Sequence, residues 1–90
     1  MVVYKIVYTK DSIKDIEKLK GANLNKKVLA LIDIIKNNPF QTPPPYEKLV
    51  GDLQGLYSRR INIKHRLVYQ ILENVQTVKI ISMWIHYEKL

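Results

Sequence analysis

A few residues in the second half of the chain carry the side chains with which RNA can be cleaved. They are one carboxylate, Glu47, two arginines of a basic segment, Arg60 and Arg66, and an imidazole near the end of the chain, His86. Cleavage of RNA without a metal ion needs a base for the 2′-hydroxyl proton, cations for the pentacoordinate phosphate and an acid for the departing 5′-oxygen. Together, these residue types indicate phosphoryl-transfer chemistry on RNA.

Taken singly, each of these residues also has an ordinary structural interpretation. By composition Glu47 is a solvated surface residue, His86 is a structural or an edge histidine, and Arg59 with Arg60 is a solvated or phosphate-binding pair. Trp84 is either a platform on which bases stack or a hydrophobic plug, and the sequence favours neither.

The segment from residue 55 to residue 69 combines strand-forming residues with four cations and no acid. Burying unpaired charge is costly, so this density of cations predicts an anionic partner on the sheet. We expect RNA to be contacted by Arg59, Arg60, Lys64 and Trp84.

Composition limits the function classes. The 90 residues include 15 basic and 8 acidic ones, and the resulting net charge of +7 favours nucleic acid or an acidic protein as partner. The chain has no cysteine, no signal-peptide pattern and no apolar run near the length of a membrane span, so we expect a cytoplasmic protein. Its two histidines lie 21 residues apart with no ligand spacing around them, so no metal or other cofactor is expected.

The first half of the chain predicts one strand and two helices. Residues 2–8 are typical of a strand, with either parity able to face the core. The first helix is capped by Thr9 or Asp11 and ends at Gly21, and the second spans about residues 24–37. The apolar stripes of the two helices are Ile13, Ile16 and Leu19, and Val28, Leu31, Ile32 and Ile35.

The second half predicts an antiparallel sheet. A proline-rich loop over residues 38–45 ends the second helix, and residues 46–53 are expected to form a short helical turn. Strands are predicted near 57–63, 65–73 and 77–86, with a turn over 73–76. We predict one domain over residues 1–90, of the α+β class, with two N-terminal helices on one face of a mainly antiparallel sheet. A linker at the prolines is the alternative interpretation.

Strand alternation predicts which side chains share a face. The face toward the helices is predicted to hold Ile61, Ile63, Leu67, Tyr69, Ile71, Ile81, Met83 and Ile85. The uncovered face is predicted to hold Arg60, Asn62, Arg66, Val68, Gln70, Ser82, Trp84 and His86. A single β-bulge would reverse part of this assignment.

Two stretches, EKLVGDLQGLYSRRI over residues 47–61 and HRLVY over residues 65–69, resemble the signature of the Txe/YoeB family. These proteins are toxins of type II toxin–antitoxin systems within the RelE superfamily. The pair His86-Tyr87 matches the family's closing His-Tyr, and length, basicity and element order agree over nearly the whole chain.

This resemblance implies a microbial-RNase-like fold and ribosome-dependent cleavage of mRNA in the A site, which leaves a 2′,3′-cyclic phosphate and a 5′-hydroxyl. The implied roles are general base for Glu47, general acid for His86, transition-state stabilisation for Arg66, phosphate contact for Arg60, substrate orientation for Tyr87 and a structural role for His65. The implied partners are the ribosome with its mRNA and a cognate antitoxin of YefM/Phd type or similar, and self-association into a homodimer is one expected state.

Three positions depart from the family pattern. Val50 stands where a lysine is common, Trp84-Ile85 replaces a basic-aromatic pair, and residues 88–90 continue the chain past Tyr87. Two alternative functions therefore stay open: a non-catalytic basic module that blocks translation by binding the ribosome or RNA, and a module whose basic face grips an acidic peptide.

Overall fold

The computed structural model describes residues 3–86, and this part of the chain forms five strands and two α-helices. The strands are Lys5–Tyr8 (β1), Tyr46–Lys48 (β2), Leu56–Arg60 (β3), His65–Leu72 (β4) and Thr77–His86 (β5). The helices are Lys10–Gly21 (α1) and Asn25–Asn37 (α2), with 3-10 turns at Gly51–Leu53 (η1) and Glu73–Val75 (η2). Within the described part, no helix is long and apolar enough to cross a membrane.

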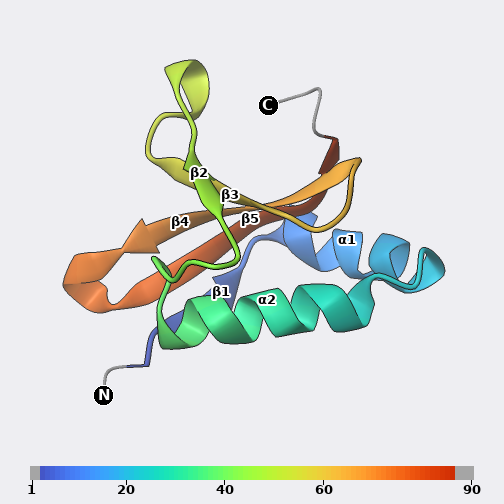
Figure 1. The fold of residues 1–90 in the computed structure, drawn as a ribbon, viewed down its shortest axis with the longest axis horizontal. Helices are drawn as coiled ribbons and strands as arrows, with labels where there is room; N and C mark the ends of the chain where they lie inside the picture. The colour runs from blue at the N-terminus through green and yellow to red at the C-terminus, as the bar shows by residue number, and fades with distance from the viewer. Residues whose placement is uncertain (1–2, 87–90) are drawn as a thin grey trace.

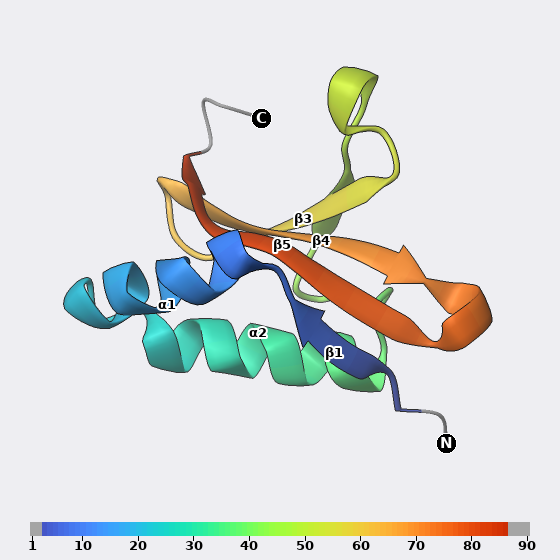
Figure 2. The same cartoon turned by 180° about the vertical axis from the view of Figure 1, so that it is seen from behind.

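The strands form one sheet in the order β1-β5-β4-β3-β2, in which only β1 and β5 run parallel. Both helices lie on the same side of this sheet, and the segment around β2 and η1 rises on the other side (Figures 1 and 2). The predicted α+β class, with two helices on one face of a mainly antiparallel sheet, is confirmed. One face is thereby left uncovered.

Helix α2 matches its predicted face, because its four apolar positions are all buried. Helix α1 matches less well: Thr9 caps it by accepting a hydrogen bond from the Ser12 amide at 3.1 Å, but Ile13 is 54% exposed. The buried positions of α1 are instead Ser12, Asp15 and Leu19. The prediction that the helix ends at Gly21 is confirmed, but the left-handed residue beyond its end is Asn23 and not the glycine.

The region after the proline loop also differs from the prediction. A helical turn was expected over residues 46–53, but Tyr46–Lys48 pairs with β3 as an edge strand, and the turn is confined to Gly51–Leu53. Glu47 therefore lies on a strand, opposite Ser58. The predicted turn over 73–76 is confirmed, with Gln76 in the left-handed conformation before β5.

Irregular pairing between β4 and β5 changes the predicted faces. Register shifts lie between Arg66 and Val68 and between Val68 and Tyr69, so β5 has extra residues opposite β4. As a result, the buried positions of β5 change parity, from Val78 and Ile80 to Met83. A bulge reverses the alternation beyond it.

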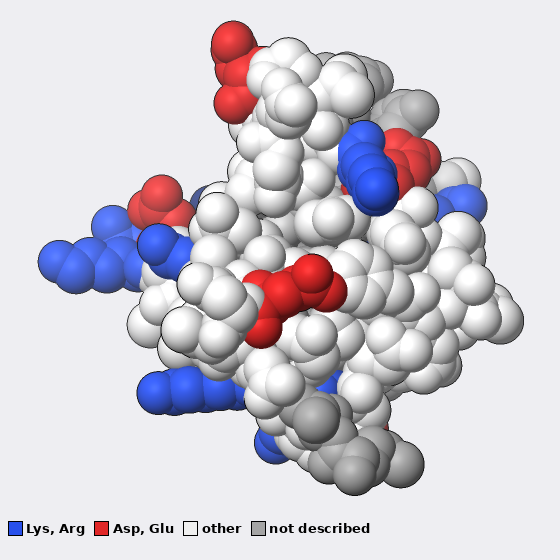
Figure 3. Space-filling view, turned by 90° about the vertical axis from the view of Figure 1, so that its left-hand side faces the viewer, with Lys and Arg blue, Asp and Glu red and all other residues white. Residues whose placement is uncertain are grey.

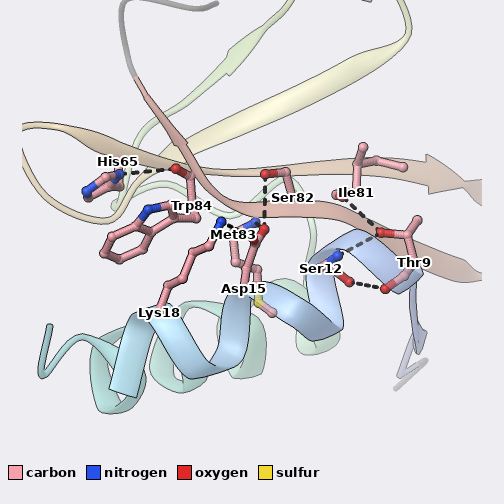
Figure 4. Close-up of polar contacts among 9 residues, drawn as sticks. All are labelled: Thr9, Ser12, Asp15, Lys18, His65, Ile81, Ser82, Met83 and Trp84. Atoms are coloured by element: carbon pink, nitrogen blue, oxygen red, sulfur yellow. Dashed lines mark hydrogen bonds and ion pairs between the residues drawn. The ribbon is translucent and has the colours of Figure 1, made fainter. Parts of the chain in front are cut away.

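Asp15 of α1 joins the helix layer to this irregular part of β5 (Figure 4). Its Oδ2 accepts hydrogen bonds from the Met83 amide at 3.0 Å and the Ser82 hydroxyl at 3.3 Å, and Lys18 approaches its Oδ1 at 3.9 Å. Because a bulge disrupts the ladder of backbone hydrogen bonds, this carboxylate supplies the partner that Met83 needs. The contact fixes the last part of β5, which ends at His86.

Charge is distributed unevenly over the surface. The end of the molecule seen in Figure 3 shows mostly uncharged surface, with acidic side chains near its centre and at its edges and lysine or arginine side chains mainly toward its edges. This end lies on the left of Figure 1, where β4 turns into β5 through η2.

Candidate active site

A pocket of 250 Å³ opens between β2, β3 and β4. Its described lining is Pro45, Glu47, Ser58, Arg60 and Arg66. Ser58 and Arg60 are two residues apart on β3, so they share a face, while the intervening position points toward the interior. The pocket therefore lies on the sheet face opposite the helices.

The register of the strands brings together three of the residues predicted from the sequence, namely Glu47, Arg60 and Arg66. Arg60 pairs directly with Arg66 across β3 and β4, and Glu47 pairs with Ser58 across β2 and β3. Glu47 and Arg60 are exposed, and Arg66 is half-buried. The result is one carboxylate beside two guanidinium groups. The guanidinium groups suit an anion, and the carboxylate can accept a proton from a hydroxyl next to that anion.

Arg66 is held in place by the turn that precedes its strand. Its Nη1 donates to the carbonyl oxygens of Asn62 at 2.7 Å and His65 at 3.1 Å. The Asn62 side chain in turn accepts hydrogen bonds from the amides of Lys64 and His65, at 2.9 and 2.7 Å. This turn fixes the guanidinium at the pocket and leaves Lys64 exposed beside it.

Arg59 occupies a different place from its neighbour. It is 1% exposed, and its guanidinium donates to the Tyr69 hydroxyl at 3.0 Å and to the carbonyl oxygens of Pro39 at 3.0 Å and Pro44 at 2.6 Å. It also lies 5.3 Å from the centre of the Tyr46 ring. The prediction that Arg59 contacts RNA is therefore wrong: Arg59 fastens the proline loop, and hence β2, to the sheet.

Trp84 does not lie on the uncovered face either. Its ring packs against the core and stacks on His65, with 3.9 Å between ring centres, on the side of β5 that faces α1 (Figure 4). His65 Nδ1 also lies 3.2 Å from the Trp84 carbonyl oxygen. The prediction that Trp84 lies on the uncovered face is wrong, because the bulges of β5 shift this residue, and its packing against the core favours the hydrophobic plug over the base-stacking platform.

His86 is exposed at the end of β5 and pairs with His65, with their rings edge to face at 5.6 Å. Arg66, the next residue of β4, pairs with Ile85. His65 and Arg66 are consecutive residues of β4, so they point to opposite faces of the sheet. His86, which pairs with His65, therefore does not lie on the same face as Arg66, and the prediction that they share a face is wrong. Tyr87, also predicted for the site, lies outside the described residues.

Two residues of the site were not predicted from the sequence. Ser58 is 2% exposed and lines the pocket, and Asn62 positions Arg66 through its turn. Strand alternation could have identified Ser58, because it lies two positions before Arg60. An asparagine just after a strand is also a common turn residue, which was the available signal for Asn62.

Comparisons with known proteins show the family of this chain. The family described as "YoeB-like toxin of bacterial type II toxin-antitoxin system" matches residues 8–87. Toxin YoeB of Synechocystis sp. is 41% identical over 66 residues, which are 73% of this chain and 74% of that protein.

Solved structures give the same result. A YoeB/ParE toxin from Agrobacterium tumefaciens superposes with a TM-score of 0.82 at 35% identity, over 92% of this chain and 99% of the other. The toxin of a YoeB dimer from Staphylococcus aureus superposes with a TM-score of 0.79 at 31% identity, over 96% and 100% of the two chains. The chain therefore belongs to the YoeB-like toxins of bacterial type II toxin–antitoxin systems.

Proposed function

We propose that this toxin is a ribosome-dependent endoribonuclease that cleaves mRNA in the A site and so inhibits translation. The observation that carries the proposal is the pocket in which Glu47 lies with Arg60 and Arg66 on the uncovered face. Membership in the YoeB-like toxins supports the same reaction class.

The proposed reaction is a transesterification that uses only groups of the protein and the RNA. Glu47 takes the 2′-hydroxyl proton, and the 2′-oxygen attacks the adjacent phosphorus while the bond to the 5′-oxygen breaks. Arg66, with Arg60 beside it, stabilises the charge that develops on the phosphorane oxygens. The departing oxygen receives a proton, so the products are a 2′,3′-cyclic phosphate and a 5′-hydroxyl.

We assign the acid of this reaction to His86. Its imidazole is exposed at the end of β5, and the assignment rests on the match to the family's closing His-Tyr; to act on a substrate in the pocket, the imidazole must turn toward the face that carries Arg66. Tyr87 follows it directly in the sequence, and we keep its proposed role in orienting the substrate. Lys64, exposed beside Arg66, is proposed to contact RNA phosphate.

One observation favours a second candidate function. Since His86 contacts His65 and is not part of the described pocket lining, the chain could occupy the A site and block translation by binding alone. The two functions are distinguished by incubating the purified toxin with ribosomes programmed with a defined mRNA. Cleavage in the A-site codon supports the nuclease, and ribosome binding with intact mRNA supports the second function.

Replacement of Arg66 by lysine is expected to slow single-turnover cleavage by roughly 10- to 100-fold, although the charge is kept. Lysine cannot reproduce the planar fork of donors that serves both the turn carbonyls and the phosphate. The measurement is the rate of mRNA cleavage at saturating toxin. Arg60→Lys is the comparison, and its effect should fall mainly on ribosome affinity and salt dependence. A parental rate for Arg66→Lys would remove Arg66 from the chemical step.

The proposed partner in the cell is an antitoxin. Two of the similar solved structures are YoeB–YefM complexes from Staphylococcus aureus, at 34% and 33% identity, and another is a YoeB dimer. By analogy, we propose a YefM-like antitoxin and self-association as the partners of this chain. An acidic antitoxin segment would complement the cations of the pocket.

Addition of such an antitoxin is expected to raise the melting temperature of the toxin progressively with concentration, because it binds only the folded state. The same addition should stop mRNA cleavage. Both effects are measured in one titration with the product of the gene adjacent to that of the toxin. An antitoxin that stabilises the toxin but leaves cleavage intact would exclude inhibition at this face.

A further inference from the structure

Ser58 is a buried polar residue whose hydroxyl has no partner within residues 3–86. It is 2% exposed, yet no hydrogen bond of its side chain exists in the described part of the chain. Other buried polar side chains differ: the Ser12 hydroxyl donates to the Thr9 carbonyl at 2.8 Å, and Arg59 has three acceptors. Buried polar groups are nearly always paired, so this exception needs an explanation.

The explanation is that the Ser58 hydroxyl is exposed to the pocket. Among the described residues, no side-chain oxygen or nitrogen that is sealed from solvent lacks a partner. The unpaired Ser58 oxygen must therefore reach solvent, and it does so through the pocket that it lines with Glu47 and Arg60. A hydroxyl with one narrow opening into a pocket is placed to bond to what enters that pocket.

The neighbours of Ser58 define the chemistry of that ligand. Glu47 lies directly opposite on β2, Arg60 is two residues along β3, and Arg66 pairs with Arg60 on β4. Two guanidinium groups favour an anion, and a hydroxyl between them and the carboxylate can donate its proton to an anionic oxygen.

We infer that Ser58 is a substrate-binding residue whose hydroxyl donates a hydrogen bond to a non-bridging phosphate oxygen of the RNA in this pocket. This inference rests on the proposed function, because it takes RNA as the occupant. The hydroxyl adds a neutral donor at the floor of the pocket to the two cationic donors at its rim. It is preorganised, because β3 is the central strand of the three that form the pocket.

The test is the variant Ser58→Ala, which removes only the unpaired oxygen. Single-turnover cleavage on programmed ribosomes should slow by about 10- to 100-fold, which is the value of a hydrogen bond to a charged group. The melting temperature should not fall, because no bond within the protein is lost. Ser12→Ala is the matched control: it removes a buried hydroxyl that has a protein partner, so it should lower the melting temperature and leave the cleavage rate of folded toxin unchanged.

A second measurement separates this inference from the nuclease proposal. A dinucleotide with a 2′-deoxy sugar cannot be cleaved, and its binding is followed by NMR titration of the backbone amides. Weaker binding by Ser58→Ala supports the contact even if the parental toxin cleaves no mRNA, in which case the nuclease proposal alone has failed. Parental cleavage together with parental dinucleotide binding by Ser58→Ala would overturn the inference.

Discussion

Replacement of Glu47 by glutamine is expected to lower single-turnover mRNA cleavage by roughly 10²–10⁴-fold, the usual value of general acid–base catalysis. The amide keeps the size of the side chain but cannot accept the 2′-hydroxyl proton. Because Glu47 is exposed on an edge strand, the fold and much of the ribosome affinity should persist. The measurement is quenched-flow cleavage at saturating toxin, with ribosome binding followed in parallel.

Glu73→Gln provides the matched control, since Glu73 is an exposed carboxylate on the β4–β5 turn, far along the sheet from the pocket. It should cleave at the parental rate. His86→Gln is expected to show a loss similar to that of Glu47→Gln if the histidine supplies the leaving-group proton. Near-parental cleavage by either Glu47→Gln or His86→Gln would exclude that residue from the proposed chemistry.

Replacement of Arg59 by methionine is expected to destabilise the fold by about 3–5 kcal/mol. The change removes the guanidinium donor from the Tyr69 hydroxyl and from the carbonyl oxygens of Pro39 and Pro44, which leaves only the 3.5 Å hydrogen bond from the Tyr69 hydroxyl to Pro39. Each buried group that loses its partner costs about 1–3 kcal/mol. Total stabilities are about 5–15 kcal/mol, so much of the folded population could be lost. Urea denaturation measures the effect.

The neighbouring arginine is the control for this variant. Arg60→Met changes an exposed residue of the same strand and should alter the unfolding free energy by no more than about 0.5 kcal/mol. Equal effects of the Arg59 and Arg60 variants would contradict the structural role of Arg59.

Tyr69 gives this cluster a pH dependence. Burial raises the pKa of Tyr69 above its ordinary value of 10.0, although the Arg59 guanidinium acts against this shift. A raised pKa in the folded state means that folding favours the protonated phenol. The stability contributed by this group is therefore complete below pH 10.0 and is lost as the pH rises toward the folded-state pKa.

The sequence predicted the fold well where one pattern dominates. The spacing of Val28, Leu31, Ile32 and Ile35 has only one helical interpretation, and all four residues are buried. Helix α1 was harder, because its buried face contains Ser12 and Asp15, which are polar residues that become buried only through specific hydrogen-bond partners. Hydrophobic periodicity does not report such partners.

The site was predictable only where it depends on the regular alternation of a strand. Arg60 and Arg66 lie on β3 and β4, which pair with each other without a register shift, so alternation placed the two arginines correctly on one face. Trp84 and His86 follow the bulges of β5, and the sequence contains no local signal for an extra residue in a strand. Arg59 required knowledge of the proline loop that folds over it, which is a long-range contact.

The most direct test of the account is the chemistry of the mRNA ends left on programmed ribosomes. Purified toxin is incubated with ribosomes that hold a defined mRNA, and the fragments are analysed by mass spectrometry. The account predicts one cut in the A-site codon, an upstream fragment that ends in a 2′,3′-cyclic phosphate and a downstream fragment that begins with a 5′-hydroxyl. Ribosome binding without any cut, or fragments with a 3′-hydroxyl and a 5′-phosphate, would contradict it.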